Sequence, residues 1–437
     1  MHWILVKEHR MVDNSSVINF RNTDAVDGKT EDLAKYTIPI PDDLVLQVCF
    51  NSGCNCECKF CFEQYWKFRN QIISQDLVYK YLKPLYPKTK VLVPTLCEIT
   101  ACKEGYEYLK WISDNYKNIN VFIETNGLAF NEKWRQLAAK NLFDIKVSVN
   151  AISDETFRRT VWDPKGNQHV FSGKIKPNVE KYYELLKEQG KECFAPSFSC
   201  VLNSTNYDEV EEFVKQSLQW GSHHVIFHVD AIENDVRHGC TKDNEGLNRA
   251  LLVLAELEKL LSGHVALSYK LFMPSDLLQH YLAKASLLSL DTLKAKYSEI
   301  WSLAEHKKLK DIIDKKNALR AINGKQQFTY NEEVNGITVH KKKTEECSDL
   351  VCGNPWQHLR FILDGRIEVC SWRQTNKQFR VENFVRNGEI DWNEVINSDY
   401  FKQTRCDFSR GKYNEKCMRN CPAMMNYEHD ISQEILS

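Results

Sequence analysis

The apolar run Leu44-Val-Leu-Gln-Val-Cys-Phe50 leads directly into Cys54-Asn-Cys-Glu-Cys58-Lys-Phe60-Cys61. In this stretch Cys54, Cys58 and Cys61 form a C-x3-C-x2-C triplet. The chain has 16 Cys in 437 residues, so only about 0.03 such triplets are expected by chance. Three thiolates on one short loop can bind three irons of a [4Fe-4S] cluster and leave the fourth iron open for chemistry. The spacing therefore predicts a cluster with one open iron at this loop.

The alternative for the same loop is a zinc site, because thiolates at short spacing bind zinc equally well. Zinc sites usually use C-x2-C knuckles arranged in pairs, whereas this loop is a single triplet. Cys56 is a further thiol inside the loop. The spacing predicts that it is a bystander, although spacing alone leaves it open as a ligand.

Composition narrows the class of protein. The chain is 43% hydrophobic, which suffices for the cores of two or three domains. Its net charge of −1 gives no overall field to attract nucleic acid, so a nucleic-acid substrate is disfavoured. The N-terminus does not read as a signal peptide, and no uncharged apolar run is long enough for a membrane helix. Cysteines in such a chain indicate metal or redox chemistry in a reducing compartment, and we expect a cytoplasmic protein.

From Leu44 onward, strand-like and helix-like segments alternate, which is typical of parallel α/β units. The strands are expected at Leu44–Phe50, Lys90–Pro94, Val121–Glu124, Asp144–Val149, Ala195–Leu202 and His223–Asp230. The helices between them are expected at Gln75–Leu85, Glu104–Tyr116, Glu132–Lys140, Lys176–Gln189 and Tyr207–Gly221. Residues 1–43 are expected to form an N-terminal extension, and residues 243–340, rich in Leu, Ala, Lys and Glu, a helical bridge.

The cysteine loop, with the aromatic Phe60 before its last Cys, resembles the cluster loop of radical S-adenosylmethionine (SAM) enzymes. This resemblance implies a partial (β/α)6 TIM-like barrel over residues 44–242. It also implies that SAM binds the open iron and is cleaved to a 5′-deoxyadenosyl radical, which abstracts a substrate hydrogen. An electron donor such as flavodoxin or ferredoxin would reduce the cluster. In such barrels the chemistry lies at the carboxyl ends of the strands, where this loop is expected.

The resemblance extends to the ends of the following strands. Glu98 stands where the family has the acid of a Gly-Gly-Glu-Pro segment, although both glycines and the proline are missing here. Its carboxylate would bind the SAM ammonium group, and a surface Glu is the alternative. Thr125-Asn126-Gly127 is similar to the family's Thr-Asn-Gly turn. Ser148 and Asn150, on one face of the fourth strand, would contact the SAM ribose or carboxylate or, alternatively, cap the next helix.

Polar residues also end the later strands, where they could contact substrate or adenine. These residues are Asn203, His228 and Asp230. A lone His in such a position is more often structural. The sequence therefore assigns no catalytic residue.

A second group of cysteines occupies the last quarter of the chain. Asp364-Gly365 predicts a hairpin turn between Leu359–Leu363 and Arg366–Val369, and its strands would bring Cys352 and Cys370 together. This segment, together with Cys417 and Cys421, resembles the auxiliary-cluster extension called SPASM or its shorter form, twitch. The resemblance implies a small cysteine-rich α+β domain over residues 341–437 with one auxiliary [4Fe-4S] cluster. Its ligands would be Cys352, Cys370, Cys417 and Cys421, with Cys347 and Cys406 as substitutes, and a structural zinc is the alternative.

These features together predict a radical SAM enzyme that abstracts hydrogen from a peptide or from a small, sugar-like molecule. The alternative from another class is a non-catalytic iron–sulfur or zinc protein that transfers electrons or senses redox state. SAM cleavage by the reduced protein separates the two classes.

Overall fold

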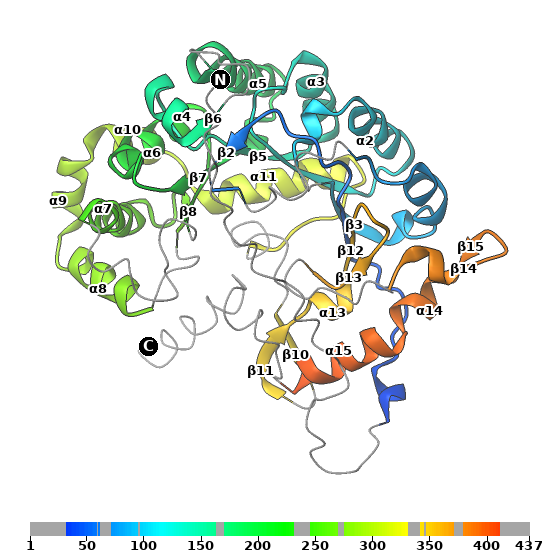
Figure 1. Ribbon diagram of the computed structural model, residues 1–437. Coiled ribbons are helices and arrows are strands. Elements are labelled where there is room, and N and C mark those ends of the chain that lie inside the picture. Colours follow the sequence, from blue (N-terminus) through cyan, green and yellow to red (C-terminus); the bar gives the residue numbers. More distant parts are fainter. Residues whose placement is uncertain are drawn as a thin grey trace, which may run out of the picture.

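The computed structural model describes residues 32–58, 60–61, 71–94, 97–162, 170–230, 245–269, 275–330, 341–344, 347–370 and 379–410. Its main feature is a curved parallel sheet with helices on its outer face (Figure 1). All six predicted strands are present: β1 Leu44–Val48, β3 Thr89–Val93, β4 Asn120–Thr125, β5 Asp144–Ser148, β7 Ser197–Leu202 and β8 His224–Val229. They pair in this order and in parallel. The predicted α/β class is therefore confirmed.

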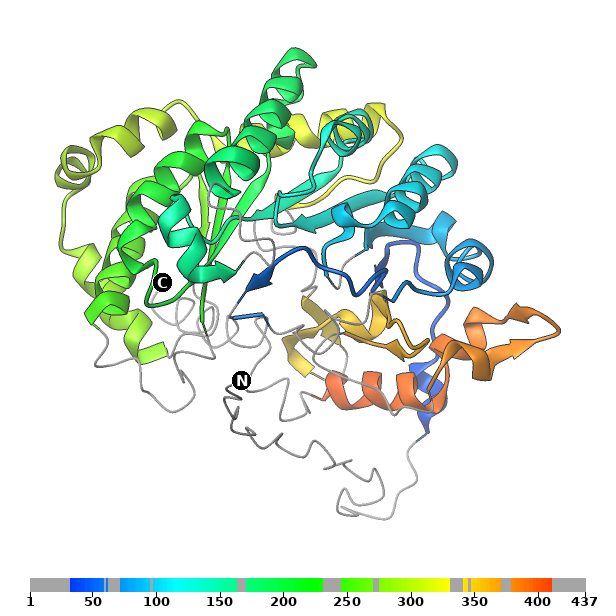
Figure 2. The ribbon, with the colours of Figure 1, turned by 45° about the horizontal axis from the view of Figure 1, so that its top comes forward.

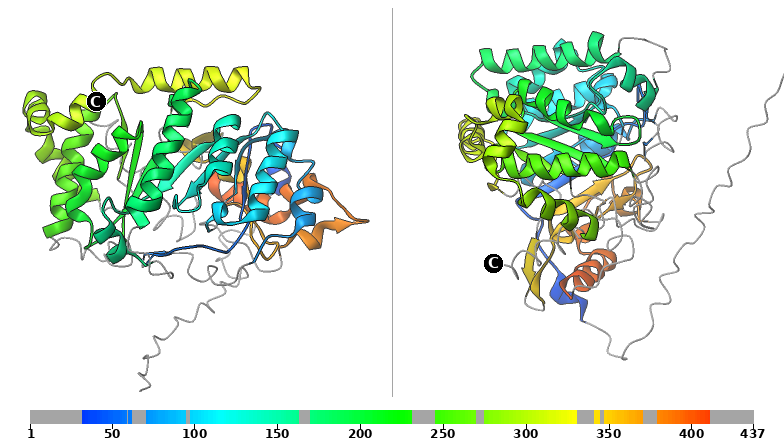
Figure 3. Two further views of the ribbon diagram at one scale, coloured as in Figure 1. Left: turned by 90° about the horizontal axis from the view of Figure 1, so that it is seen from above. Right: turned by 90° about the vertical axis from the view of Figure 1, so that its left-hand side faces the viewer.

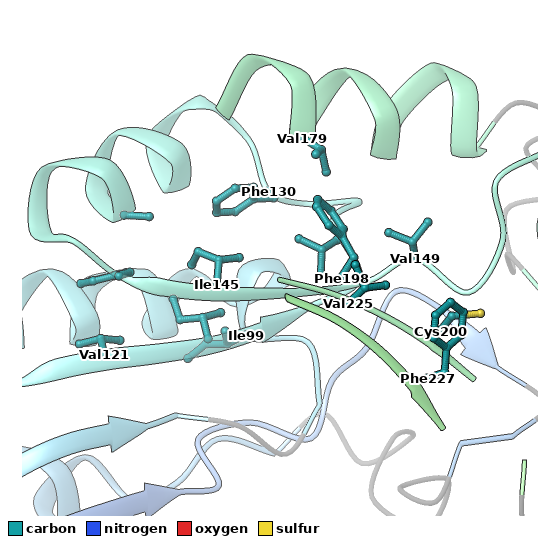
Figure 4. Close-up of a cluster of buried hydrophobic side chains, with 14 of the residues drawn as sticks. Ile99, Val121, Phe130, Ile145, Val149, Val179, Phe198, Cys200, Val225 and Phe227 are labelled. Atoms are coloured by element: carbon teal, nitrogen blue, oxygen red, sulfur yellow. The ribbon is translucent and has the colours of Figure 1, made fainter. Parts of the chain in front are cut away.

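The core lies between the outer face of the sheet and the helices. The helices that follow the strands are α2 Lys103–Asn115, α3 Glu132–Asn141, α4 Asp154–Thr160, α5 Lys176–Glu188 and α6 Val210–Gln219. Ile145 and Phe198 point from the strands toward Phe130 and Val179 on the helix side (Figure 4). Because side chains alternate along a strand, the residues between these apolar ones face the inner side of the sheet. This alternation decides which polar side chains can reach a substrate.

One predicted helix is shorter than expected. In the segment predicted as a helix from Gln75 to Leu85, the helical residues end at Tyr81, with Gln75 and Asp76 followed by the π-helix η2, Leu77–Tyr81. The Leu82 amide ends it by donating to the carbonyls of Leu77 and Lys80. Pro84 cannot continue the ladder because it has no backbone N–H.

Two further strands extend the parallel sheet, one at each edge. β9, Ala266–Ser268, pairs in parallel with β8, and β12, His358–Phe361, pairs in parallel with β1. β12 turns into the antiparallel β13, Ile367–Glu368, so the hairpin predicted around Asp364-Gly365 is present. It lies at the edge of the barrel sheet.

Helices fill most of the predicted helical bridge. They are α7 Glu245–Leu261, α8 Ser275–Ser286, α9 Leu290–Lys296, α10 Ser298–Ala304 and α11 Leu309–Ile322. α11 lies at the amino-terminal end of β5, where Lys316 and Arg320 bind the Asp144 carboxylate at 2.7 and 2.9 Å. Beyond it, Phe328 packs among Val45, Val91 and Val93 on the inner face. α11 therefore lies at the amino-terminal end of the barrel, on the side away from the blue segment of the cysteine loop (Figure 3).

The C-terminal elements gather beside β1. They are β10 Lys341–Thr344, β11 Cys347–Cys352, α13 Asn354–Gln357, β14 Val385–Arg386, β15 Glu389–Ile390, α14 Trp392–Ile396 and α15 Asp399–Ser409. The N-terminal turn η1, Leu33–Tyr36, packs on α15, and the buried Arg405 donates to the Tyr36 carbonyl at 2.8 Å (Figure 2). The described part of the N-terminal extension thus supports the C-terminal elements.

Candidate active site

The cysteine loop leaves the carboxyl end of β1 and is held at both ends. Asn51 Nδ2 donates to the carbonyl oxygens of Gly53 and Glu98 at 3.0 and 3.3 Å. Ser52 N–H donates to the Gln71 carbonyl at 2.9 Å, and the Gln71 backbone N–H donates to Ser52 Oγ at 2.8 Å. Within the loop, β2, Glu57–Cys58, pairs antiparallel with β6, Val161–Trp162. The loop is therefore fixed over the carboxyl ends of the strands, as predicted.

The structure separates the four loop thiols into two kinds. Cys54, Cys58 and Cys61 are partly exposed, whereas Cys56 is 1% exposed and belongs to the main apolar core. Phe60, 9% exposed, packs into the same core. A thiol buried among apolar side chains behaves as a small hydrophobe, so Cys56 serves as an anchor of the loop. The accessible set matches the predicted triplet.

The three accessible thiols fit an iron–sulfur cluster in ligand type and in number. Within the described ranges, no three His, Cys, Asp or Glu side chains are close enough together to hold a metal ion. The ligand set Cys54, Cys58 and Cys61 therefore stays a prediction about the loaded protein.

Glu98 links the loop to the ends of β3 and β4. Its side chain is 3% exposed, and its backbone N–H donates to the Gly53 carbonyl at 3.1 Å. Thr125 Oγ1 donates to Oε1 at 2.8 Å, and the Asn126 amide donates to Oε2 at 2.6 Å. Thr100 donates to Oε1 through both its amide and its hydroxyl. Burial raises the pKa of Glu98, and these hydrogen bonds act in the opposite direction.

The Thr-Asn-Gly turn lies against the cysteine loop. Asn126 Nδ2 donates to Asn55 Oδ1 at 2.7 Å and lies 3.4 Å from Cys56 Sγ. Gly127 has a φ of +78°, and a Cβ there would lie 3.3 Å from Ile175 and Val147. The turn therefore needs glycine both for its backbone and for its packing.

Ser148 and Asn150 lie together at the end of β5 but bind different partners. Ser148 Oγ is 3.1 Å from Ser199 Oγ on β7. Asn150, 4% exposed and with a φ of 58°, accepts the Val201 amide at Oδ1 at 2.9 Å. The next helix is capped by Ser153 instead, whose Oγ accepts the Thr156 amide. Asn150 thus links β5 to β7. Helix capping, the alternative expected for Ser148 and Asn150, is provided by Ser153.

Further polar residues on the inner face were not singled out by the sequence. Glu124 on β4 and Lys146 on β5 form an ion pair across neighbouring strands. Burial alone would raise the pKa of Glu124, but Lys146 holds it below its usual value. Charged residues inside otherwise apolar strands are the signal that could have revealed them.

His228 lies near this pair, at the end of β8. Burial and the charge of Lys146 lower its pKa to about 4, so its imidazole is neutral near pH 7. Its buried Nδ1 has no hydrogen-bond partner among the described residues. Asn203, by contrast, accepts hydrogen bonds at its Oδ1 from the backbone amide and the hydroxyl of Thr205. Asp230 is buried, and its amide donates to the Leu202 carbonyl at 2.8 Å.

The C-terminal cysteines are described only in part. Cys352 ends β11 and packs against Trp356 and Phe408, and Cys370 follows β13; both are buried. Cys406 is buried on α15. Cys417 and Cys421 lie outside the described residues. The auxiliary ligand set therefore remains a prediction.

Comparison with solved structures gives low similarity. Streptococcus suis SuiB bound to its precursor peptide SuiA is 14% identical, with a TM-score of 0.47 over 93% of this chain and 79% of SuiB. The protein anSMEcpe with bound AdoMet and a Cp18Cys peptide is 16% identical, with a TM-score of 0.47 over 87% of this chain and 88% of that chain.

The sequence comparisons are more specific. The FeMo cofactor biosynthesis protein NifB of Methanocaldococcus infernus is 30% identical over 179 residues, which is 37% of this chain and 59% of the relative. The same protein of Methanocaldococcus jannaschii is 28% identical over 180 residues, again 59% of its length. The matching part thus spans less than two thirds of these relatives. Residues 48–217, which include the cysteine loop and the strands β3 to β7, match the family model of the radical SAM superfamily. Residues 48–217 of this chain therefore match a radical SAM domain.

Proposed function

We propose that this protein is a radical SAM enzyme, which reductively cleaves SAM at the Cys54-Cys58-Cys61 loop and uses the resulting 5′-deoxyadenosyl radical to abstract hydrogen from a peptide or small molecule. The observation that supports this most is the sorting of the loop thiols, in which the triplet is accessible and Cys56 is buried. When bound, the cluster supplies the electron that cleaves SAM. The protein orients SAM and substrate.

The surrounding residues support a SAM pocket beside the loop. Glu98 would place a carboxylate near the SAM ammonium group, where a charge-assisted hydrogen bond is strong. Ser148 offers a hydroxyl on the same side of the sheet, paired with Ser199. Asn150 would act mainly through its backbone position, because its Oδ1 already accepts the Val201 amide. Phe60 would shield the last ligand, Cys61, from the core side.

The substrate would lie on the inner face of the sheet, against Glu124, Lys146 and His228. The ion pair carries no net charge, and His228 is neutral near pH 7. Such a surface favours hydroxyl, amide or zwitterionic groups over a polyanion. Both a peptide and a sugar-like molecule meet this requirement. α11 lies at the other end of the barrel, so substrate and electron donor would arrive from the side of the cysteine loop.

The C-terminal cysteines would hold one auxiliary [4Fe-4S] cluster in a SPASM- or twitch-like extension. Cys352 and Cys370 supply two of the proposed thiolates from the segment that flanks the hairpin. The cluster would accept an electron from the substrate or hold the substrate in place. A flavodoxin or ferredoxin would deliver the electron that starts the reaction.

The test is SAM cleavage by anaerobically reconstituted protein reduced with dithionite, measured as 5′-deoxyadenosine. We expect cleavage by the wild type and none by the variant with Cys54, Cys58 and Cys61 all changed to Ala. Cys193→Ala, a partly exposed thiol away from the loop, is the matched control and should cleave normally. Formation of 5′-deoxyadenosine by the triple variant would refute the loop assignment. An iron-loaded wild type that never cleaves SAM would favour the non-catalytic iron–sulfur alternative.

A further inference from the structure

The side chain of Asn126 reaches from the end of β4 to the cysteine loop. Its Nδ2 donates to Asn55 Oδ1 at 2.7 Å and lies 3.4 Å from Cys56 Sγ and 3.9 Å from Cys54 Sγ. One carboxamide thus faces two sulfurs and the residue between them. Cys54 is one of the three proposed cluster ligands.

The orientation of this carboxamide is determined by its neighbours. Asn126 Oδ1 accepts the Leu128 backbone N–H at 3.0 Å. A backbone N–H can only donate, so the atom facing it is the oxygen, and the NH₂ group must face the loop. The backbone amide of Asn126 is also held, by Glu98 Oε2 at 2.6 Å. The donor is therefore preorganised.

Hydrogen bonds to sulfur and solvent exposure tune the potential of an iron–sulfur cluster. A donor near a ligand sulfur stabilises the extra negative charge of the reduced cluster and so makes reduction easier. The same Asn126 Nδ2 group also contacts Asn55 and the buried Cys56, and these contacts hold the loop in place. The side chain can thus both hold the loop and tune the cluster.

We propose that Asn126 is a positioning and redox-tuning residue, which aligns the cysteine loop and raises the reduction potential of the cluster bound there. This inference rests on the proposed cluster at Cys54, Cys58 and Cys61. Cys56 acts as the buried anchor through which Asn126 holds the loop.

Two substitutions separate tuning from a purely structural role. Asn126→Asp is nearly isosteric and keeps an oxygen for the Leu128 amide, but it turns an oxygen toward the sulfurs in place of the donor. Asn126→Ala removes the donor without adding charge. If the role is tuning, the midpoint potential should decrease in the order wild type, Ala, Asp. If the role is structural only, Ala should disturb the loop more than Asp.

The matched control is Asn178→Ala. Asn178 Nδ2 donates to the Gly127 carbonyl at 2.9 Å, so this change weakens the same turn from the outer side without touching the loop. It should leave the potential unchanged.

The experiment is a redox titration of the reconstituted full chain, followed by electron paramagnetic resonance, with iron counted in each variant. For Asp we expect at least a tenfold lower ratio of reduced to oxidised cluster at a fixed potential, a shift of about 59 mV for one electron. Equal potentials in all variants with normal iron content would overturn the inference, as would an Asp variant that behaves like the wild type. A wild type without a loop cluster would instead refute the proposed function.

Discussion

Glu98 is the residue on which the two sides of the candidate site meet. Its backbone contacts Gly53 in the cysteine loop, and its carboxylate accepts donors from Thr100, Thr125 and Asn126. A buried acid with this many donors has a clear structural role. Whether its charge also serves SAM is a separate question that a single substitution can answer.

Glu98→Gln removes the negative charge while keeping the size of the side chain. We expect SAM to bind more weakly by about 1–3 kcal/mol, because a charge-assisted hydrogen bond to the ammonium group is lost. Equilibrium binding of SAM to the iron-loaded protein measures this. Glu104→Gln, at an exposed carboxylate in the first turn of α2, should change nothing. Unchanged affinity in Glu98→Gln, with full iron content, would restrict Glu98 to its structural role.

At the scale of elements, α11 is held to the barrel by a buried charge cluster. Arg320 is fully buried and Lys316 nearly so, and both bind Asp144 at the start of β5. Burial alone would raise the pKa of Asp144, but the two cations lower it to about 2. The ionised Asp144 therefore stabilises the fold at pH values above the ordinary pKa of an aspartate. This contribution is lost as the pH falls through about 2.

Asp144→Asn should lower the free energy of unfolding by about 3–5 kcal/mol at pH 7, because two buried cations lose their partner. Urea denaturation followed by circular dichroism measures the loss. The difference from the wild type should shrink between pH 4 and pH 2, as Asp144 becomes protonated in the wild type. Asp114→Asn breaks an exposed pair with Lys110 and should leave the free energy of unfolding nearly unchanged, because solvent screens such a pair. A near-neutral Asp144→Asn at pH 7 would show that α11 does not depend on this cluster.

At the scale of the whole molecule, α11 lies at the amino-terminal end of the barrel and the cysteine loop at the carboxyl end, with Phe328 on the inner face between the strands. β12 pairs with β1, the strand from which the cysteine loop leaves, and β13 pairs with β12. The C-terminal part of the chain therefore lies beside β1. Among the described residues, no helix is both long and apolar enough to cross a membrane. The cysteine loop and Cys370 therefore follow β1 and β13, two strands of one connected sheet.

The iron content tests the proposal of two clusters. The reconstituted chain should bind about eight irons, and the Cys54/Cys58/Cys61 triple variant about four. Cys352→Ala combined with Cys370→Ala should also retain about four, now at the loop, and should still cleave SAM. Elemental analysis of iron and zinc measures all three proteins. About four irons with about one zinc in the wild type would support the zinc alternative, and about twelve irons would require a second auxiliary cluster.

Local patterns in the chain were sufficient for much of this picture. The alternation of apolar strands and helices predicted six parallel strands, and Asp364-Gly365 predicted the hairpin, because turn type and side-chain period depend on neighbouring residues. The C-x3-C-x2-C spacing likewise predicted a cluster loop directly after β1, and its ligand role stays a prediction. The helix predicted from Gln75 to Leu85 ends early, before Pro84, because proline has no backbone N–H with which to continue the hydrogen-bond pattern.

Contacts between distant residues required the tertiary structure. The pairing of β12 with β1 joins positions more than 300 residues apart, and Arg320 meets Asp144 across 176 residues. The split between the buried Cys56 and the accessible Cys54, Cys58 and Cys61 also depends on packing. The hydrogen bond from the Val201 amide to Asn150 and the contact of Asn126 with the loop depend on packing as well. Spacing along the chain can name residues able to bind a cluster, but only the folded strands show which of them share one end of the barrel.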